Sequence, residues 1–83
     1  MVTAHPVHPG AALRDRLMTP LGLSVPKLAS TLGVSVRRIQ EIVRGRRGVS
    51  RDTAHRLEVA WGTPAQFWLD LQRRYDDARH APR

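Results

Sequence analysis

The sequence predicts an all-α domain built from five helices. Apolar residues recur at three- and four-residue spacing in five segments, and glycine or proline punctuates the gaps between these segments. No stretch shows the alternating apolar and polar pattern of a strand. Because 83 residues can bury only a small core, the helices have to pack closely for the domain to be stable.

The limits of the domain follow from where this periodicity begins and ends. Residues 1–8 include Pro6 and show no periodicity, so we expect a flexible lead-in followed by a single domain over residues 9–80. The start of the chain lacks the features of a secretory signal, and no apolar run approaches the roughly 20 residues that span a bilayer. The chain also has no cysteine. We therefore expect a cytoplasmic protein without disulfides, thiolate metal sites or contact with a membrane.

The first helix is expected to begin near Pro9, since proline is tolerated in the first turn of a helix. Leu13 and Leu17 lie four residues apart and share its inner face. Pro20 and Gly22 mark its end, because neither residue continues a helix readily. This segment therefore contributes one apolar face to the core.

Residues 24–44 predict two short helices joined by a tight turn. Ser24 offers an N-cap hydroxyl to the first of them, Gly33 permits the turn because it has no Cβ, and Ser35 caps the second, over about 36–44. A small residue stands four positions before the glycine, and apolar residues stand six and nine positions after it: Ala29, Ile39 and Ile42. This spacing is typical of a helix-turn-helix, in which two steeply crossing helices need a small side chain at their closest approach.

Two further helices are predicted after this motif. Ser50 caps the fourth helix and Gly62 closes it. Its core stripe has three- and four-residue spacing and comprises Ala54, Leu57, Ala60 and Trp61. Thr63 and Gln66 predict a capping box at the start of the fifth helix, which should run over about 64–79.

The charge of the chain is strongly positive and unevenly placed. Fourteen Lys and Arg residues oppose seven Asp and Glu residues, which leaves a net charge of +7. Seven arginines fall within residues 37–56 beside only two acidic residues, Glu41 and Asp52. Such a local basic patch is typical of nucleic-acid binding. The preference for Arg over Lys fits bidentate contacts to phosphate and guanine, although genome composition explains it equally well.

Four strings then carry a resemblance to a known family. They are HPG at residues 8–10, LGLS at 21–24, RIQEIVRGRRGVS at 38–50 and GTPAQFWLDLQRRYD at 62–76. Together they resemble the HigA family of antitoxins, within the XRE group of helix-turn-helix proteins. The resemblance implies a lambda-repressor-like fold and a homodimer that binds palindromic operator DNA ahead of its own operon. It also implies neutralisation of HigB, a ribosome-dependent mRNA-cleaving toxin.

One position departs from that pattern. Repressors of this group often have Gln at the start of the second helix, where the amide contacts a phosphate, whereas this chain has Val25. That contact cannot be carried over, and Ser24 with nearby backbone N–H groups would replace part of it.

The outward face of the third helix supplies the expected DNA contacts. With its two isoleucines inward, a step of about 100° per residue places Arg37 and Gln40 outward. We expect Arg37 to read guanine, Gln40 to read adenine and Val36 to meet a thymine methyl group. Glu41 should orient Arg37 and Arg44, or alternatively accept from cytosine.

Phosphate contacts are expected from the two helix N-termini and from the end of the third helix with its following loop. The candidates are Ser24, Ser35, Arg38, Arg44, Arg46 and Arg47.

The fifth helix carries more apolar bulk than one packed side requires. We expect Phe67 to face inward and the residues nearer a second subunit to be Trp68, Leu69, Gln72 and Tyr75. The alternative is that Phe67 and Leu71 only close the core over Trp61.

Catalytic and metal sites are not expected. His5 and His8 form an H-x-x-H pair, but no third ligand lies nearby, and no nucleophile–base pair or phosphate-binding glycine loop is present. We expect no enzyme activity, cofactor, metal or small-molecule ligand.

Three functions remain open from the sequence. The first is an antitoxin that represses its own operon, with toxin contacts on the folded surface near Arg14 and Arg16, on the fourth helix, or at exposed acidic residues: Asp15, Glu58, Asp76 and Asp77. The second is a stand-alone XRE-family repressor without a toxin. The third is a protein-interaction module that no longer binds DNA, which the arginine cluster argues against.

Overall fold

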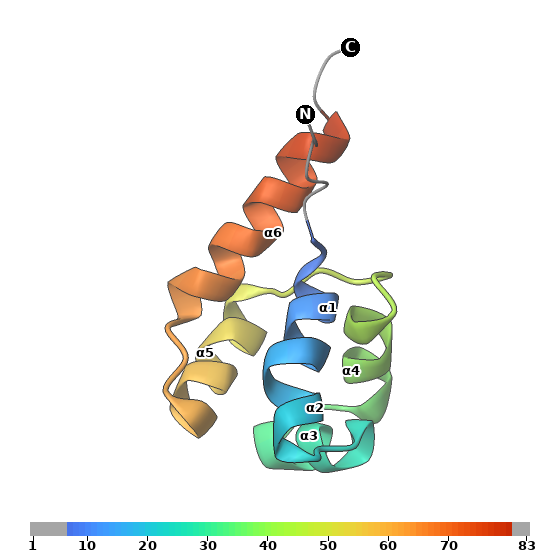
Figure 1. Cartoon of the computed structure of the whole chain (residues 1–83). Helices are drawn as coiled ribbons and strands as arrows, with labels where there is room; N and C mark the ends of the chain where they lie inside the picture. The colour runs from blue at the N-terminus through green and yellow to red at the C-terminus, as the bar shows by residue number, and fades with distance from the viewer. Residues whose placement is uncertain (1–6, 81–83) are drawn as a thin grey trace.

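The computed structural model describes residues 7–80, and this part of the chain is helical without strands (Figure 1). The elements are α1 (Pro9–Leu13), η1 (Arg14–Met18), α2 (Thr19–Leu21), α3 (Val25–Leu32), α4 (Val36–Val43), α5 (Arg51–Trp61) and α6 (Ala65–His80). Because α1, η1 and α2 follow one another without a break, they form a single first helix. The predicted all-α fold of five helices is therefore confirmed. Residues 1–6, most of the expected lead-in, lie outside the described residues.

The first helix is less regular than the sequence predicts. Its middle, η1, is a π-helical turn in which the Thr19 N–H donates to the Arg14 carbonyl five residues earlier. This turn ends two residues before Pro20, which has no N–H to donate to the carbonyl four residues before it. The helix then ends at Gly22 in the left-handed region, with φ 65°.

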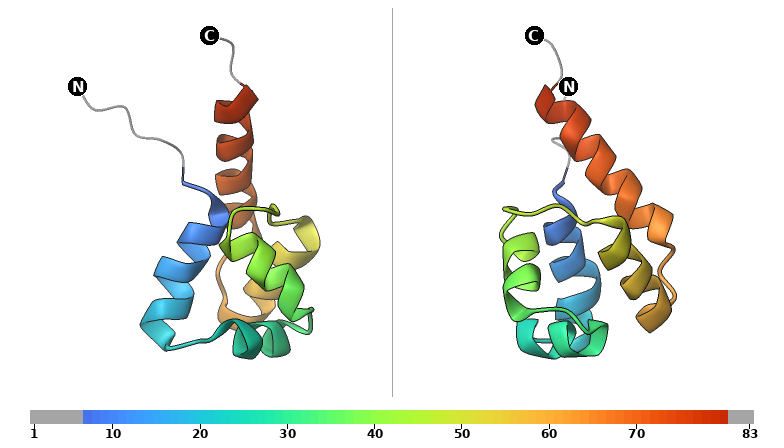
Figure 2. Two further views of the ribbon diagram at one scale, coloured as in Figure 1. Left: turned by 90° about the vertical axis from the view of Figure 1, so that its right-hand side faces the viewer. Right: turned by 180° about the vertical axis from the view of Figure 1, so that it is seen from behind.

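The core lies between the first helix and the other four. The buried apolar side chains are Ala12, Leu13, Leu17, Met18, Leu28, Ala29, Leu32, Ile39, Ile42, Val49, Ala54, Leu57 and Trp68. The N-terminal end of α1 packs directly against the C-terminal end of α4. A Cβ placed on Gly10 would overlap the carbonyl oxygen of Ile42, so only glycine permits this approach. The first helix thus supports the helix-turn-helix, formed by α3 and α4 (Figure 2).

The predicted serine caps are confirmed. The Oγ atoms of Ser24, Ser35 and Ser50 accept from the backbone N–H groups three residues later at 3.1–3.2 Å. Gly33 ends α3 with φ 73°, in the left-handed conformation that the turn requires.

The predicted capping box before α6 is wrong. Thr63 accepts from the indole N–H of Trp68 at 3.0 Å, so its hydroxyl serves a buried side chain rather than the helix end. The carboxylate of Glu58, from α5, accepts from the Ala65 N–H at 3.1 Å and satisfies the first turn instead. Burial of an indole N–H needs an acceptor, and Thr63 is the residue that provides it.

The expected orientations of Phe67 and Trp68 are reversed. Trp68 is 1% exposed and belongs to the core, whereas Phe67 is half-buried with the guanidinium of Arg16 lying 5.4 Å from its ring centre. The larger indole fills the space beneath α6 with its N–H satisfied, so Trp68 has no surface to offer a second subunit. The predicted place of Trp68 at a dimer interface is therefore wrong.

None of the helices within residues 7–80 combines the length and the apolar character that a membrane crossing requires.

Candidate nucleic-acid interface

The outer face of α4 carries the side chains predicted to read bases. Ile39 and Ile42 are fully buried on the inner face, as the helical period predicts. On the opposite face Val36 is 40% exposed, the Arg37 side chain is 84% exposed, and Gln40 is exposed. In the left view of Figure 2, α4 faces the viewer with no other helix in front of it. Three neighbouring polar and apolar side chains can therefore reach an external ligand together.

Glu41 ties two arginines of this surface together. Its Oε2 accepts from Arg37 Nε at 3.3 Å, and its Oε1 accepts from Arg47, with Nη2 at 2.7 Å and Nε at 2.8 Å. These hydrogen bonds, the one from Arg47 first, lower the pKa of the Glu41 carboxyl and keep it ionised. Arg37 is thus held on α4 through its Nε, while its two terminal nitrogens make no hydrogen bond within residues 7–80 and the side chain stays largely exposed.

The predicted pairing of Glu41 with Arg44 is wrong. Helix α4 ends at Val43, and the chain then turns back so that the N–H groups of Arg46 and Arg47 donate to the Glu41 carbonyl at 2.8 and 3.2 Å. This turn carries Arg47 to the Glu41 carboxylate and leaves Arg44 on the outside.

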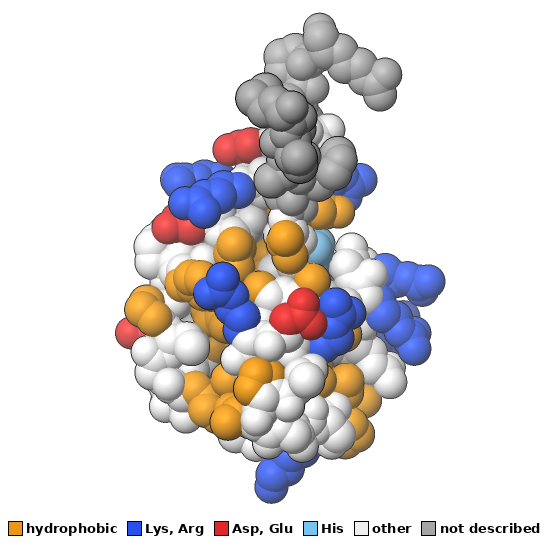
Figure 3. Space-filling view, in the orientation of Figure 1, with side chains coloured by type: hydrophobic (Ala, Val, Ile, Leu, Met, Phe, Trp, Pro, Cys, Tyr) orange, Lys and Arg blue, Asp and Glu red, His pale blue; other side chains and the backbone are white. Residues whose placement is uncertain are grey.

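The loop after α4 presents the remaining cations. Arg44 and Arg46 are exposed, and neither makes an ion pair within residues 7–80. In the space-filling view, Lys or Arg side chains project from the edge of the molecule beside α4 (Figure 3). Guanidinium groups with no internal partner are the ones that an external anion can engage without first breaking a pair.

The two predicted serines lie at the N-termini of α3 and α4. Each Oγ already accepts one backbone N–H, but a hydroxyl keeps its own proton for donation, and both residues are exposed. A helix N-terminus also carries partial positive charge and unpaired N–H groups. Ser24 and Ser35 are therefore placed to bind an anion such as a phosphate.

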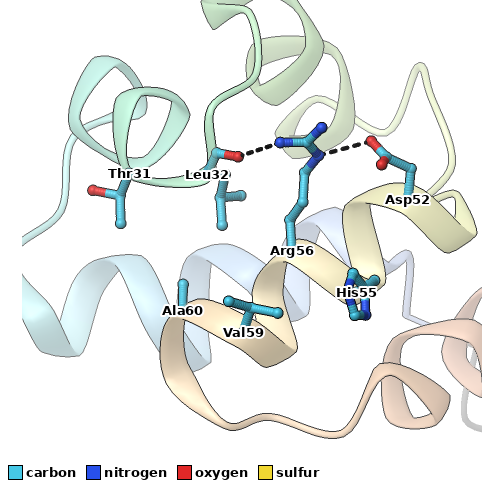
Figure 4. A pocket seen from close by; sticks show the side chains of 7 residues that line it. All are labelled: Thr31, Leu32, Asp52, His55, Arg56, Val59 and Ala60. Atoms are coloured by element: carbon cyan, nitrogen blue, oxygen red, sulfur yellow. Dashed lines mark hydrogen bonds and ion pairs between the residues drawn. The ribbon is translucent and has the colours of Figure 1, made fainter.

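Arg38 differs from the other predicted phosphate ligands. Its Nη1 donates to Asp52 Oδ2 at 2.9 Å, and the same oxygen accepts from Arg56 Nε at 2.9 Å. Arg56 in turn donates to the Leu32 carbonyl at 2.9 Å (Figure 4). The sequence reasoning missed this chain of contacts, although the Asp52–Arg56 spacing of four residues was a signal for one of its links. The two hydrogen bonds, from Arg56 and then Arg38, lower the pKa of Asp52.

The α6 residues predicted for a dimer interface are partly engaged within the chain. Gln72 Oε1 accepts from the Val49 N–H at 2.9 Å and anchors the segment before α5. The Tyr75 ring packs edge-on against His8 with 4.8 Å between ring centres. Leu69 is half-buried and lines a shallow depression, with Arg51 and Arg73 among the residues around it.

His8 has a structural role. Its Nδ1 accepts from the Gly10 N–H at 2.9 Å and caps α1. The other member of the H-x-x-H pair, His5, lies outside the described residues. Within residues 7–80 no three His, Cys, Asp or Glu side chains come close enough together to hold a metal ion.

Comparison with known proteins relates this geometry to a family. Virulence-associated protein I of Dichelobacter nodosus is 50% identical over 70 residues, which make up 84% of this chain and 65% of that protein. The solved structure of the Pseudomonas aeruginosa antitoxin HigA with higBA promoter is 43% identical, covers 89% of this chain and 80% of its own, and has a TM-score of 0.86. The chain belongs to the HigA family of antitoxins. No protein-family model matches the chain.

A second similar structure contains DNA. It is a Pseudomonas aeruginosa protein in complex with its 18 bp operator DNA, 40% identical, covering 95% of this chain and 85% of that one, with a TM-score of 0.90. This HigA-family chain spans about two thirds (65%) of the length of the Dichelobacter relative. The comparisons confirm the helix-turn-helix fold and the resemblance inferred from the sequence, and the relatives are antitoxins or DNA-binding regulators rather than enzymes.

Proposed function

We propose that this HigA-family chain is the antitoxin of a type II toxin–antitoxin system, which binds operator DNA as a homodimer, represses its own operon and neutralises a HigB-like mRNA-cleaving toxin. The observation that carries the DNA-binding part is the exposed face of α4, where Arg37 and Gln40 stand beside unpaired loop arginines. Relatives of the same fold are known in complex with promoter or operator DNA, which supports the same use of this face.

Base reading would fall to the N-terminal half of α4. Because the Arg37 Nε donates to Glu41, its two terminal nitrogens are the ones that would donate to O6 and N7 of a guanine. Gln40, nearly one turn further along, would contact N6 and N7 of an adenine, and the Val36 side chain would pack against a thymine methyl group. Each good base contact contributes about 1–3 kcal/mol of discrimination against the wrong base.

Phosphate binding would surround these base contacts. Ser24 and Ser35 would donate their hydroxyls at the two helix N-termini, and Arg44 and Arg46 would pair with phosphates at the other end of α4. Arg47 would have to exchange Glu41 for a phosphate. Arg38 would contribute mainly through its bond to Asp52.

One recognition helix reads only half of a palindromic site, so the chain would bind as a homodimer. Helix α6 would form the interface between the two copies. Among the predicted interface residues, Leu69 has the most suitable position, since it borders a surface depression with charged residues of both signs, Asp70 and Arg73. Tyr75 and Gln72 would add their exposed edges. The length of α6, whose C-terminal half projects beyond the other helices (Figure 1), favours contact with a second copy there.

The proposal of toxin neutralisation rests on membership of the HigA family. The acidic side chains of the surface indicate where the toxin would bind. A toxin that cleaves mRNA has to bind a polyanion and is therefore expected to be basic. Exposed acidic side chains away from the DNA face would meet it, among them Asp15, Asp76 and Asp77.

The test is a fluorescence anisotropy titration of the full chain against duplex DNA from upstream of its own gene and against a scrambled duplex, at two salt concentrations. We expect selective and salt-dependent binding, and we expect Arg37→Ala to lose selectivity. Arg14→Ala is the matched control, because Arg14 also donates through Nε to a nearby carboxylate, that of Asp15, but lies on η1. Equal affinity of the wild type for both duplexes would refute the repressor mechanism.

A second experiment separates the antitoxin from a stand-alone repressor. The chain is co-expressed with the product of the adjacent gene, and cell growth and co-purification are measured. An antitoxin restores growth and co-purifies with that product, whereas selective DNA binding without either effect would favour the stand-alone repressor.

A further inference from the structure

One side chain of α5 reaches out of its own helix to the turn of the helix-turn-helix. The Nη1 of Arg56 donates to the carbonyl of Leu32 at 2.9 Å and lies 3.5 Å from the carbonyl of Gly33. Figure 4 shows the guanidinium standing between Leu32 and Asp52, with one edge toward each. A single planar group therefore joins α5 to the end of α3.

The carbonyls at this point need an external donor. The last carbonyls of a helix have no partner within the helix, and the partial negative charge there favours a cation. Gly33 also turns the chain toward α4 at this point. Arg56 fills the space next to this glycine, since its Nη1 lies 3.2 Å from the position that a Cβ on Gly33 would occupy. Arg56 thus packs against the turn as well as bonding to it.

Asp52 extends the connection to α4. Its Oδ2 accepts from Arg56 Nε and from Arg38 Nη1, both at 2.9 Å, and Arg38 lies in the first turn of α4. Two neighbouring residues of α5, Ala54 and Leu57, are fully buried, so α5 is a firm base for this arrangement. The Arg38–Asp52–Arg56 triad therefore fastens both the end of α3 and the start of α4 to the body of the domain.

We propose that Arg56 is a positioning residue for operator reading, which acts with Asp52 to set the orientation in which α4 presents Arg37 and Gln40 to the bases. The proposal rests on the DNA-binding function proposed above. Base contacts need side chains placed to within about half an ångström, so a small rotation of α4 removes selectivity before it removes attraction to phosphate.

A positioning role and a phosphate-binding role predict different measurements. A lost phosphate contact weakens binding to every sequence and reduces the salt slope by about one. A lost positioning contact weakens binding to the operator and leaves the scrambled duplex and the salt slope unchanged. The two duplexes therefore distinguish the roles directly.

The experiment compares the wild type with Arg56→Lys, Arg56→Gln and Asp52→Asn, each as the full chain and at a temperature where circular dichroism shows it folded. Arg56→Lys keeps the charge but loses the planar fork that donates in two directions at once. We expect each Arg56 variant to bind the operator about tenfold more weakly, equivalent to about 1.4 kcal/mol, with the scrambled duplex unaffected. Arg14→Gln, which removes another arginine paired with an aspartate, should bind both duplexes nearly as the wild type does.

Amide hydrogen exchange provides a readout that does not depend on DNA. The Val34 N–H donates to the Ala29 carbonyl across the turn at 3.0 Å, and we expect this amide to exchange faster in Arg56→Lys while core amides of α5 are unchanged.

Equal loss of affinity for both duplexes would indicate that Arg56 is a phosphate ligand and would overturn the proposal. Arg56 variants that bind both duplexes as the wild type does would also overturn it. If the wild type itself shows no operator preference, the proposed function fails and the role of Arg56 in operator reading fails with it; hydrogen exchange then tests only whether Arg56 holds the turn. Unchanged exchange at Val34 would refute the structural role of Arg56, and faster exchange confined to the turn would support that role.

Discussion

Replacement of Glu41 by Gln should make the protein bind DNA more tightly and less selectively. In the wild type, one carboxylate holds both Arg37 and Arg47, with its nearest contact 2.7 Å from Arg47. Before Arg47 can pair with a phosphate, it has to leave that carboxylate. A neutral Gln removes the competitor and also removes a negative charge from the outer face of α4, while Arg37 loses the group that orients it.

The magnitude follows from counterion release. One additional phosphate contact contributes about 0.9 to the slope of log K against log salt. At a salt concentration of about 0.1 M, this corresponds to an increase of about eightfold in affinity for a scrambled duplex. Affinity for the operator should rise less, because disorder in Arg37 offsets part of the gain, so the ratio of the two affinities falls.

The assay is the same anisotropy titration, carried out at four or more salt concentrations for the wild type and Glu41→Gln. Asp15→Asn is the control, because Asp15 also pairs with an arginine, Arg14 at 3.0 Å, but lies on η1. An unchanged salt slope in Glu41→Gln would refute the idea that Glu41 competes with phosphate. A gain of the same size in Asp15→Asn would show that only net charge matters.

Three further predictions concern the supports of this surface. Gly10→Ala should destabilise the fold by about 1–3 kcal/mol, because the new Cβ would overlap the Ile42 carbonyl oxygen and push α1 away from α4. Thermal unfolding measures this loss, and an unchanged midpoint temperature would contradict the prediction. Trp68→Ala should lower the free energy of unfolding by about 3–5 kcal/mol, and Phe67→Ala should lower it clearly less, as measured by urea unfolding. Equal losses would contradict the finding that Trp68, and not Phe67, is the buried residue. Burial lowers the pKa of His8, helped by Arg79 and opposed by Asp76, so the unfolded chain binds a proton at higher pH than the folded chain. Stability should therefore fall as the pH drops below about 6.5, because the unfolded chain takes up a proton on His8 while the folded Nδ1 still accepts from the Gly10 N–H. His8→Asn should remove this part of the pH dependence in unfolding measured at several pH values.

Local features of the chain could be predicted well because they depend on residues close together in the sequence. The caps at Ser24, Ser35 and Ser50 each involve a bond to an N–H three residues later. The turn at Gly33 and the buried positions of α4 likewise follow from backbone freedom and the helical period. These features were sufficient to identify a helix-turn-helix and its outward face.

Other features required knowledge of how the chain turns between its helices. The partner of Glu41 is Arg47 rather than Arg44, because the loop after α4 folds back and this path is not encoded in helical spacing. Arg56 bonds to a carbonyl 24 residues away, and no local pattern marks that contact.

The sequence by itself determined the class of fold, the serine-capped helix starts, the outward face of α4 and the family, since all of these depend on local spacing or on strings of residues. Only the tertiary structure decided which of two adjacent aromatic residues, Phe67 and Trp68, enters the core. Both are large and apolar, and they lie about 100° apart on one helix. The choice therefore depends on the angle at which α6 meets α1 and α5, and on the presence of Thr63 to accept the buried indole N–H.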